Sequence, residues 1–253
     1  MKRILLLAIS IPQIVFAGMD FYPQALVQKI EKRQIKDQEL ETQIFDLLSK
    51  NHKSLTYKEA KRFLFGQLHL KNGPEGYYVH DVYCKKDFTS GVGPGSVPDQ
   101  NKVNCEHTWP QSKFTSSFPA NVQQSDLHHL FPTDSRANST RGNYDFADVS
   151  ENRNISDDEC TSSKSGPSVT TGGNNYFEPP SEHKGNVARA LFYFAVRYKM
   201  EINKDQEEFL RRWDKLDPID DDERARNEQI EKIQKTRNPF VDFEGLADQV
   251  SNF

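Results

Sequence analysis

A stretch of forty residues, from Asn104 to Asn143, decides the fold of this chain. Short apolar runs alternate in it with turn residues, and glutamate, histidine and asparagine are placed between them. This pattern predicts two short strands followed by a helix, with polar side chains near the strand ends. The three motifs that carry the pattern are N-C-E-H-T-W-P-Q-S at residues 104–112, S-D-L-H-H-L-F-P-T-D at 125–134 and R-A-N-S-T-R-G-N at 136–143.

The two strands and the helix are placed by the residues at their ends. The first strand should lead into residues 105–107, and the second should run over residues 127–131 until Pro132 ends it. The helix should then begin with Asp134 or Ser135 as its cap.

His128 and His129 are neighbours in the second strand, so their side chains would point to opposite faces. We expect the inward one to brace the site through hydrogen bonds, with direct binding of a metal ion as the alternative. Asp126, which precedes the strand, is interpreted as a strand-end cap or an orienting group.

Glu106, His107 and Asn138 are the candidate site residues. Adjacent side chains of a strand point to opposite faces, so Glu106 and His107 serve one site only if the chain bends, and Pro110 is consistent with a bend. Asn138 lies 31 residues after His107, on the expected helix. A carboxylate oxygen and an amide oxygen suit a hard cation such as Mg²⁺ or Ca²⁺. A lone histidine or asparagine is more often structural, but the ordered set of motifs favours a site.

The motifs E-H-x-x-P, D-L-H-H-L-x-P and N-x-x-R-G-N together resemble the bacterial endonuclease I family, secreted nucleases built on a ββα-metal (His-Me finger) core. The resemblance covers roughly Tyr57 to Asp242. Outside the three motifs it includes F-E-P-P at 177–180, K-G at 184–185, A-R at 188–189, E-R-x-R-N at 223–227, Gln234 and R-N-P-F at 237–240.

This resemblance implies an α+β fold, with the ββα-metal core at about residues 102–145 surrounded by several α-helices. It implies that Glu106 and Asn138 bind one divalent cation, and that His107 is the general base that takes a proton from the attacking water. A neutral imidazole, with an unperturbed pKa of about 6.5, is a competent base. Mg²⁺ is the expected cation, with Mn²⁺ or Ca²⁺ as alternatives, and no other cofactor is expected. The implied substrates are DNA and RNA, cut largely without sequence preference to leave 5′ phosphates.

One segment departs from the family pattern. In many family members the segment between the two strands carries an arginine that touches the cut phosphate. The corresponding residues here, 111–125, contain no arginine, and Lys113 is their one basic residue. Arg136 or Arg141 is therefore our candidate for substrate binding. An ion pair within the R-G-N turn is the alternative interpretation of Arg141.

The N-terminus has the pattern of a signal peptide. Lys2 and Arg3 precede an apolar run over residues 4–16, and Val15 and Ala17 are small residues at the positions that a signal peptidase recognises. We expect a signal peptide at 1–17 and a periplasmic or extracellular protein, with a short buried N-terminal helix as the alternative. The run is too short to span a bilayer, so no membrane anchor is expected.

Composition indicates one soluble globular domain over residues 18–253, which we expect to be a monomer. The chain is 35% hydrophobic and 28% charged, and it is long enough to bury a full core. The net charge is −4 and becomes −6 once Lys2 and Arg3 are removed. A negative chain disfavours a passive nucleic-acid binder more than an enzyme whose bound cation supplies positive charge locally.

Three cysteines allow one disulfide in an oxidising compartment, with one thiol left over. We favour Cys84 with Cys160, because this pair closes a long ring and leaves Cys105, beside Glu106, as a small buried group. Such a ring would restrict the unfolded chain by roughly 4 kcal/mol. The two pairings that use Cys105 stay open.

Elsewhere the spacing of apolar residues predicts mainly helices. Trp109 and the aromatic residues at 192–194 should lie in the core rather than stack on bases. The acidic run at 220–223 is read as a helix N-terminus rather than a Ca²⁺ site. We expect helices over 24–51, 57–68, 184–200, 204–213 and 221–236, a strand over 77–83, and loops over 89–100 and 150–175.

Two rival functions are left open by the sequence. One is an H-N-H-type zinc phosphodiesterase in which His107, His128 and His129 gather on the metal. The other is a catalytically idle secreted protein that binds nucleic acid on the same scaffold. The complete set of Glu106, His107 and Asn138 argues against an idle protein.

Overall fold

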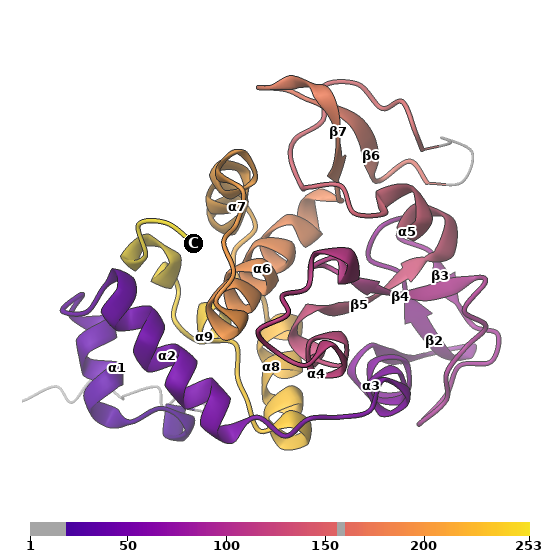
Figure 1. Ribbon diagram of the computed structural model, residues 1–253. Helices are drawn as coiled ribbons and strands as arrows, with labels where there is room; N and C mark the ends of the chain where they lie inside the picture. Colours follow the sequence, from indigo (N-terminus) through magenta and orange to yellow (C-terminus); the bar gives the residue numbers. More distant parts are fainter. Residues whose placement is uncertain (1–18, 156–159) are drawn as a thin grey trace, which may run out of the picture.

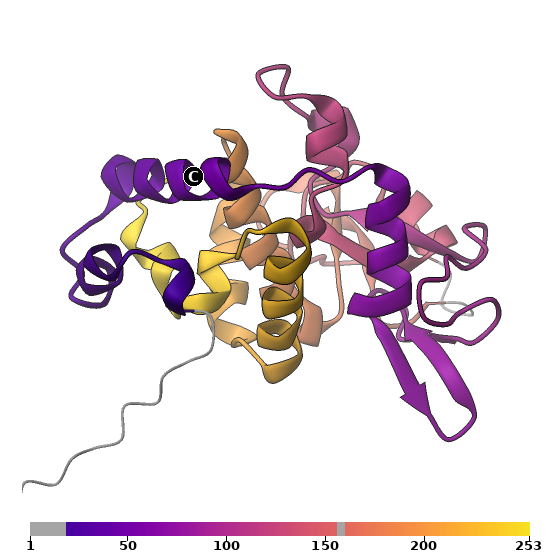
Figure 2. The same ribbon diagram turned by 90° about the horizontal axis from the view of Figure 1, so that it is seen from below.

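The structure, a computed structural model, describes residues 19–155 and 160–253. In these ranges three small antiparallel sheets lie toward one side of the molecule and most of the long helices lie toward the other, so the chain is α+β as expected (Figure 1 and Figure 2). The α-helices are α1 (Gln24–Glu31), α2 (Asp37–Asn51), α3 (Tyr57–Phe63), α4 (Ala120–Gln124), α5 (Ser135–Arg141), α6 (Lys184–Tyr198), α7 (Lys204–Leu216), α8 (Asp221–Gln234) and α9 (Pro239–Asp242). The strands are β1 (Leu70–Gly73), β2 (Gly76–His80), β3 (Asp87–Phe88), β4 (Val103–His107), β5 (Leu130–Asp134), β6 (Lys164–Ser168) and β7 (Gly172–Glu178).

The N-terminal helices are more broken than the sequence suggests. The signal peptide expected at 1–17 lies outside the described residues. The helical pattern over 24–51 folds as α1 and α2, because the chain turns between them with Arg33 and Asp37 at φ angles of 51° and 48°. The helix expected over 57–68 is regular through α3 and then widens into a π-helical turn over residues 64–68. No helix within the described ranges is long and apolar enough to cross a membrane.

Strands β4 and β5 pair antiparallel and carry the central motifs, with Glu106 opposite Phe131. The expectation that Pro132 ends the second strand is wrong, because Pro132 lies inside β5 opposite Cys105. A proline is tolerated there because β4 is the only strand that pairs with β5 in the described sheets, so its other edge needs no N–H donor. The Pro132 carbonyl accepts a hydrogen bond from the Val82 N–H at 3.0 Å.

Residues Leu127–His129 form a 3-10 turn rather than the first half of the strand. Asp126 stabilises this turn, because its carboxylate accepts a hydrogen bond from the His128 N–H at 3.2 Å. The expected alternation of His128 and His129 is therefore wrong, and both side chains are buried. One of the two interpretations of Asp126 was a strand-end cap. Asp126 does act as a cap, but it caps the 3-10 turn and not a strand.

Helix α5 begins where the sequence predicts. The Asp134 carboxylate caps it by accepting hydrogen bonds from the N–H groups of Arg136 and Ala137 at 2.9 and 3.1 Å. Gly142 ends it at a φ of 54°, a conformation that favours glycine. The successive elements β4, β5 and α5 thus bring the three central motifs together (Figure 1).

Helix α6 lies at the centre of the helical part and packs against α2 and α7 (Figure 1). Nearly all of its side chains are buried. Trp109, from the loop after β4, stacks on Phe194 of this helix with ring centroids 5.3 Å apart. The prediction that Trp109 and the aromatic residues at 192–194 are core residues is confirmed.

The acidic run at 220–223 is a helix N-terminus, as predicted. The Asp220 carboxylate accepts a hydrogen bond from the Glu223 N–H at 2.7 Å and caps α8. Helix α8 itself ends at Gln234, and α7 runs three residues beyond its expected end at residue 213.

The expectation of an irregular loop over residues 150–175 is wrong, because this range contains β6 and the start of β7. The polar composition of residues 150–175 gave no sign of this hairpin, in which most of β6 is buried. Its polar groups find partners: the Ser165 N–H donates to the Asn152 side-chain oxygen at 3.2 Å. Gly166 allows close packing, since a Cβ there would lie 2.1 Å from the Glu151 carbonyl oxygen.

Cys84 and Cys160 form a disulfide and Cys105 is a buried free thiol, which confirms the favoured pairing. The bond links the segment after β2 to the segment before β6, at a sequence separation of 76. The ring that it closes contains β4, β5 and α5, so it encloses all of the central motifs.

Replacing both Cys84 and Cys160 with serine should lower the free energy of unfolding by about 4 kcal/mol, because the unfolded chain is released from a long ring. Urea denaturation measures this loss, and reductant should produce a similar loss in the unmodified chain. A Cys105→Ala variant is the matched control and should still respond to reductant. Identical urea midpoints with and without reductant in the unmodified chain would contradict the prediction.

Candidate active site

The end of β4, the loop after it and helix α5 border an open hollow of about 490 Å³. Glu106 and His107 reach it from β4, and Asn138 reaches it from α5. The structure therefore brings the three expected site residues to one space. The other residues that line this space, which we call the β4–α5 hollow, are Tyr57, Asn104, Cys105, Pro110, Gln111, Ser112, Arg141, Gly142 and Asn143.

Glu106 is fixed in position by two other side chains. Its Oε1 accepts a hydrogen bond from the Tyr83 hydroxyl at 2.9 Å and lies 2.9 Å from the Arg141 Nη1. All three side chains are buried. Burial raises the pKa of the Glu106 carboxyl, and the Arg141 guanidinium acts against this by favouring the carboxylate. The wall of the hollow thus contains a carboxylate whose position is fixed by its two neighbours.

The two ring nitrogens of His107 have different partners. Nε2 lies 3.0 Å from the Gln124 carbonyl oxygen, which can only accept, so Nε2 carries the proton. In the neutral ring Nδ1 is then an acceptor, and the Gln111 amide nitrogen lies 3.3 Å from it. Burial lowers the pKa of His107 to about 4, with a smaller contribution from Arg141. The ring is therefore neutral near pH 7, and its basic lone pair is on Nδ1, where it faces the Gln111 amide.

The two histidines of the 3-10 turn pack around this site without joining it. The His129 ring lies 5.3 Å from the His107 ring, and its Nε2 donates to the Gln123 carbonyl at 2.9 Å. His128 donates from Nε2 to the Thr236 carbonyl at 3.2 Å. In the part of the chain that the structure describes, no three histidine, cysteine or acidic side chains gather as a metal-binding group. The zinc site formed by three histidines is therefore contradicted.

Glu106 and Asn138 have the donor chemistry for a hard divalent cation. The Asn138 amide nitrogen lies 3.5 Å from the Cys105 carbonyl, which leaves its Oδ1 as an acceptor. The carboxylate and this amide oxygen line the same hollow. Two oxygen ligands beside an open polar space fit a cation such as Mg²⁺, which keeps several water molecules when bound.

The two arginines expected to bind substrate occupy different positions. Arg136 is exposed on α5 and does not line the β4–α5 hollow. Arg141 lines the hollow but is buried, and besides Glu106 its guanidinium donates to the carbonyls of His107 and Thr108. These contacts commit Arg141 to the protein, and they differ from the ion pair within the R-G-N turn that was the alternative. Its place indicates a role in joining α5 to β4.

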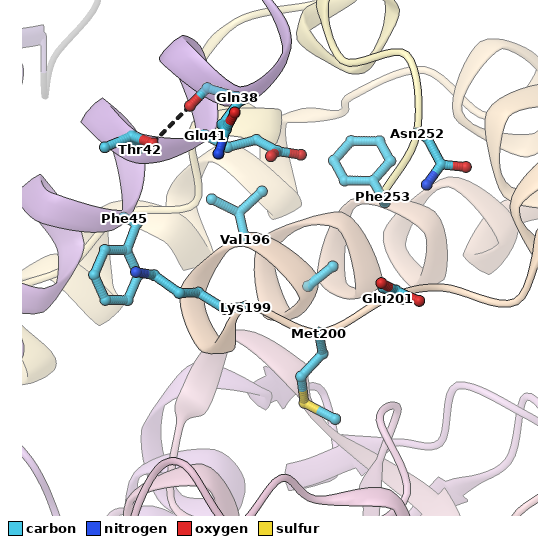
Figure 3. A pocket seen from close by; sticks show the side chains of 11 residues that line it. Gln38, Glu41, Thr42, Phe45, Val196, Lys199, Met200, Glu201, Asn252 and Phe253 are labelled. Carbon is cyan, nitrogen blue, oxygen red and sulfur yellow. Dashed lines mark hydrogen bonds between the residues drawn. The ribbon is translucent and has the colours of Figure 1, made fainter.

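Two other hollows of the described residues are of similar size. One of about 370 Å³ lies between α2 and the end of α6, where the Lys199 ammonium is 3.9 Å from the centre of the Phe45 ring (Figure 3). No histidine lines it. The other, of about 360 Å³, is lined by three histidines, His69, His80 and His183, together with several carboxylates. The His69 Nε2 accepts a hydrogen bond from Arg226 at 3.2 Å, and the His80 Nδ1 lies 2.6 Å from the Asp87 carboxylate. The β4–α5 hollow is the candidate active site because Glu106, His107 and Asn138 line it together.

Comparison with known proteins identifies the family. The family profile described as Endonuclease I matches residues 24–244. The chain belongs to the endonuclease I family. An extracellular ribonuclease of Bacillus subtilis (strain 168) is 31% identical over 266 residues, which cover 97% of this chain and 83% of that protein.

Two further relatives match shorter parts. An extracellular ribonuclease of Bacillus amyloliquefaciens is 34% identical over 187 residues, which cover 67% of this chain and 60% of the relative. A periplasmic deoxyribonuclease of Aeromonas hydrophila is 30% identical over 142 residues, which cover 56% of this chain and 57% of the relative.

The resemblance inferred from the motifs is thus confirmed. As an endonuclease I protein, the chain is an enzyme, a hydrolase that acts on ester bonds of nucleic acids. The matched range begins at residue 24, well before the limit at Tyr57 that the motifs set. The two N-terminal helices therefore belong to the family domain as well.

Three residues around the site were missed in the sequence. Tyr83 bonds to Glu106 from 23 residues away, and its only signal was the aromatic strand pattern before it. Gln111 directly follows the E-H-x-x-P motif and was passed over as a loop residue. Gln124 contacts His107 through its backbone carbonyl, and no residue type reveals such a contact.

Proposed function

We propose that this endonuclease I chain is an exported nuclease that cuts phosphodiester bonds of DNA and RNA with one divalent cation, largely without sequence preference. The observation that carries the proposal is the meeting of Glu106, His107 and Asn138 in one hollow. The printed names of the relatives support both substrates, since two are extracellular ribonucleases and one is a periplasmic deoxyribonuclease.

His107 supplies the base of the proposed reaction. Because Gln124 holds the proton on Nε2, the basic lone pair is on Nδ1, beside the hollow. Nδ1 takes a proton from a water molecule, and the oxygen of that water bonds to phosphorus. The bond from phosphorus to the 3′ oxygen then breaks, and the phosphate stays on the 5′ side. The low pKa of His107, about 4, keeps the base unprotonated near neutral pH.

Glu106 and Asn138 would hold the cation, with Mg²⁺ as the expected ion and Mn²⁺ or Ca²⁺ as alternatives. When bound, a divalent cation neutralises charge on the phosphate and makes its water ligands more acidic, which helps the leaving oxygen to gain a proton. The contribution of the chain is geometric: Tyr83 and Arg141 hold the Glu106 carboxylate where the ion needs it. Arg136, exposed on α5, is left as a candidate contact to substrate phosphates farther from the cut.

Three observations support export as part of this proposal. Residues 1–17 have the composition of a signal peptide. The disulfide between Cys84 and Cys160 is of the kind that persists in oxidising compartments. Several relatives are named extracellular or periplasmic. We therefore propose that the mature domain, residues 18–253, acts in the periplasm or outside the cell, and we keep the expectation of a monomer.

The proposal is tested by incubating the protein with supercoiled plasmid and with a folded RNA. Both should be cut in Mg²⁺, cutting should stop in EDTA, and excess Mg²⁺ should restore it, because the phosphate charge is otherwise unbalanced. The DNA ends should carry 5′ phosphates that a ligase accepts. An idle binding protein would retard the plasmid on a gel without cutting it, and cutting that persists in EDTA would contradict the need for a cation.

A further inference from the structure

A closed ring of hydrogen bonds surrounds the proposed base. His107 donates from Nε2 to the Gln124 carbonyl, and the Gln124 side-chain amide donates to the Gln111 Oε1 at 2.9 Å. The Gln111 amide nitrogen returns to His107 Nδ1 at 3.3 Å. Each donor direction follows from the one before: Nδ1 must accept, so Gln111 presents its NH₂ group there and keeps its oxygen for Gln124. The resting position of the Gln111 amide is therefore defined.

In this position the Gln111 amide blocks the proposed role of His107 as a base. Nδ1 has one lone pair, and it cannot take a proton from water while the Gln111 N–H occupies that lone pair. Turnover therefore requires the Gln111 amide to leave. Gln111 can do so without moving a strand or a long helix, because it is exposed and begins a single 3-10 turn, Gln111–Lys113.

Two positive side chains beside the hollow, Lys113 and Arg141, are already paired, and the Lys61 ammonium lies 4.8 Å from the centre of the Tyr57 ring. Residues 111–125 contain no arginine, and the ammonium of Lys113 lies 2.6 Å from the Asp145 carboxylate. Arg141 is bound to Glu106 and to two backbone carbonyls. Among the residues that line the β4–α5 hollow, Gln111 has the amide donor that already touches the base atom. If a phosphate is attacked by water beside Nδ1, a small rotation of the Gln111 side chain therefore brings its amide to that phosphate.

We propose that Gln111 is a catalytic residue: its amide leaves Nδ1 when substrate enters and donates instead to a non-bridging oxygen of the scissile phosphate. This rests on the proposed function of the site. A water molecule takes the vacated place and gives a proton to Nδ1, and its oxygen bonds to phosphorus. The bond to the 3′ oxygen breaks, its electron pair stays on that oxygen, and a proton from solvent completes the alcohol. Gln111 thereby covers the base in the free enzyme and stabilises phosphate charge in the reacting one.

A sulfur substitution at one linkage tests this contact. Three DNA duplexes carry an ordinary phosphate, an Rp phosphorothioate or an Sp phosphorothioate at one position, and cutting there is compared with cutting at the neighbouring ordinary linkages. Gln111→Ala should lower kcat/KM at ordinary linkages about tenfold to 100-fold, the effect of one lost hydrogen bond to a charged group. At one of the two phosphorothioates this loss should shrink to within about threefold, because sulfur accepts hydrogen bonds poorly.

Two further variants complete the design. Gln111→Glu should lose more activity than Gln111→Ala, because its carboxylate repels the phosphate. Lys113→Ala is the matched control in the same 3-10 turn and should stay within about threefold of the unmodified chain, since its ion pair with Asp145 is exposed. Affinity for Mn²⁺, measured by calorimetry, should be the same in all of them.

The outcomes separate this inference from the function on which it rests. An equal loss at all three linkages would assign Gln111 a purely structural role and overturn the contact. Full activity of Gln111→Ala, or a weaker affinity for Mn²⁺, would overturn it as well. If the unmodified chain fails to cut the ordinary linkage in Mg²⁺, the proposed function itself is wrong.

Discussion

Replacing His107 with alanine is expected to lower the rate of DNA cutting at least about 100-fold, the usual contribution of a positioned general base. The loss follows from the removal of Nδ1, the atom that the Gln124 carbonyl keeps free of a proton. Affinity for the cation should be unchanged, because neither ring nitrogen of His107 is proposed to bind it. Cutting rates in Mg²⁺ and calorimetric titration with Mn²⁺ measure the two quantities.

The matched control for this variant is His80→Ala. His80 is a histidine of β2 whose Nδ1 lies 2.6 Å from the Asp87 carboxylate, on the surface and outside the hollow. It should cut at the unmodified rate. Because His107 is buried, thermal unfolding of both variants must show that the fold is retained. A His107→Ala protein that is folded and cuts within a few-fold of the unmodified rate would remove His107 from the mechanism.

Sequence reasoning succeeded where a local signal fixes a local structure. Asp134 or Ser135 was expected to cap a helix, because either side chain can satisfy free N–H groups, and Asp134 caps α5. It failed where a side chain contact overrides the pattern. The D-L-H-H-L stretch reads as a strand, but the Asp126 carboxylate bonds to the His128 N–H and folds it into a 3-10 turn. The same holds for Pro132, whose place inside a strand depends on which strand edge is left unpaired.

The sequence predicted the three residues of the candidate site, but it did not predict the groups that hold them in position. Glu106, His107 and Asn138 were chosen from residue chemistry together with the family resemblance, and the structure brings them together. Their partners come from distant or unremarkable positions. Tyr83 reaches Glu106 from the segment after β2, and the Gln124 carbonyl belongs to a residue whose side chain gave no hint of it. Such contacts depend on how elements pack, and no short motif contains that information.

Arg141 explains why the N-x-x-R-G-N motif belongs with the E-H motif. It lies three residues after Asn138 on α5, so both side chains leave the same face of the helix. Asn138 reaches the hollow, while Arg141 binds the Glu106 carboxylate and the His107 carbonyl on β4. One turn of helix thus carries one proposed cation ligand and fixes the position of the other. Arg141, a sequence-based candidate for substrate binding, contacts Glu106 and the backbone of β4 in this structure.

This coupling predicts a difference between the two cation ligands. Glu106→Gln and Asn138→Ala should each weaken Mn²⁺ binding and lower cutting at least about 100-fold, because the cation loses one of its two protein ligands. Only Glu106→Gln should also destabilise the fold, by about 3 kcal/mol, because it leaves the Arg141 guanidinium buried without a counter-charge. Within the described residues the Asn138 side chain makes a single long hydrogen bond, at 3.5 Å to the Cys105 carbonyl, so its loss should cost little stability.

Urea denaturation in EDTA measures that difference, because chelation removes any stabilisation by the bound ion itself. Glutamine is the appropriate replacement for Glu106, since it keeps the shape of the side chain and can still accept the hydrogen bond from Tyr83. The loss of stability then reports the charge alone. Equal stability of the two variants would show that Arg141 does not depend on Glu106, and unchanged Mn²⁺ affinity in both would place the cation outside the β4–α5 hollow.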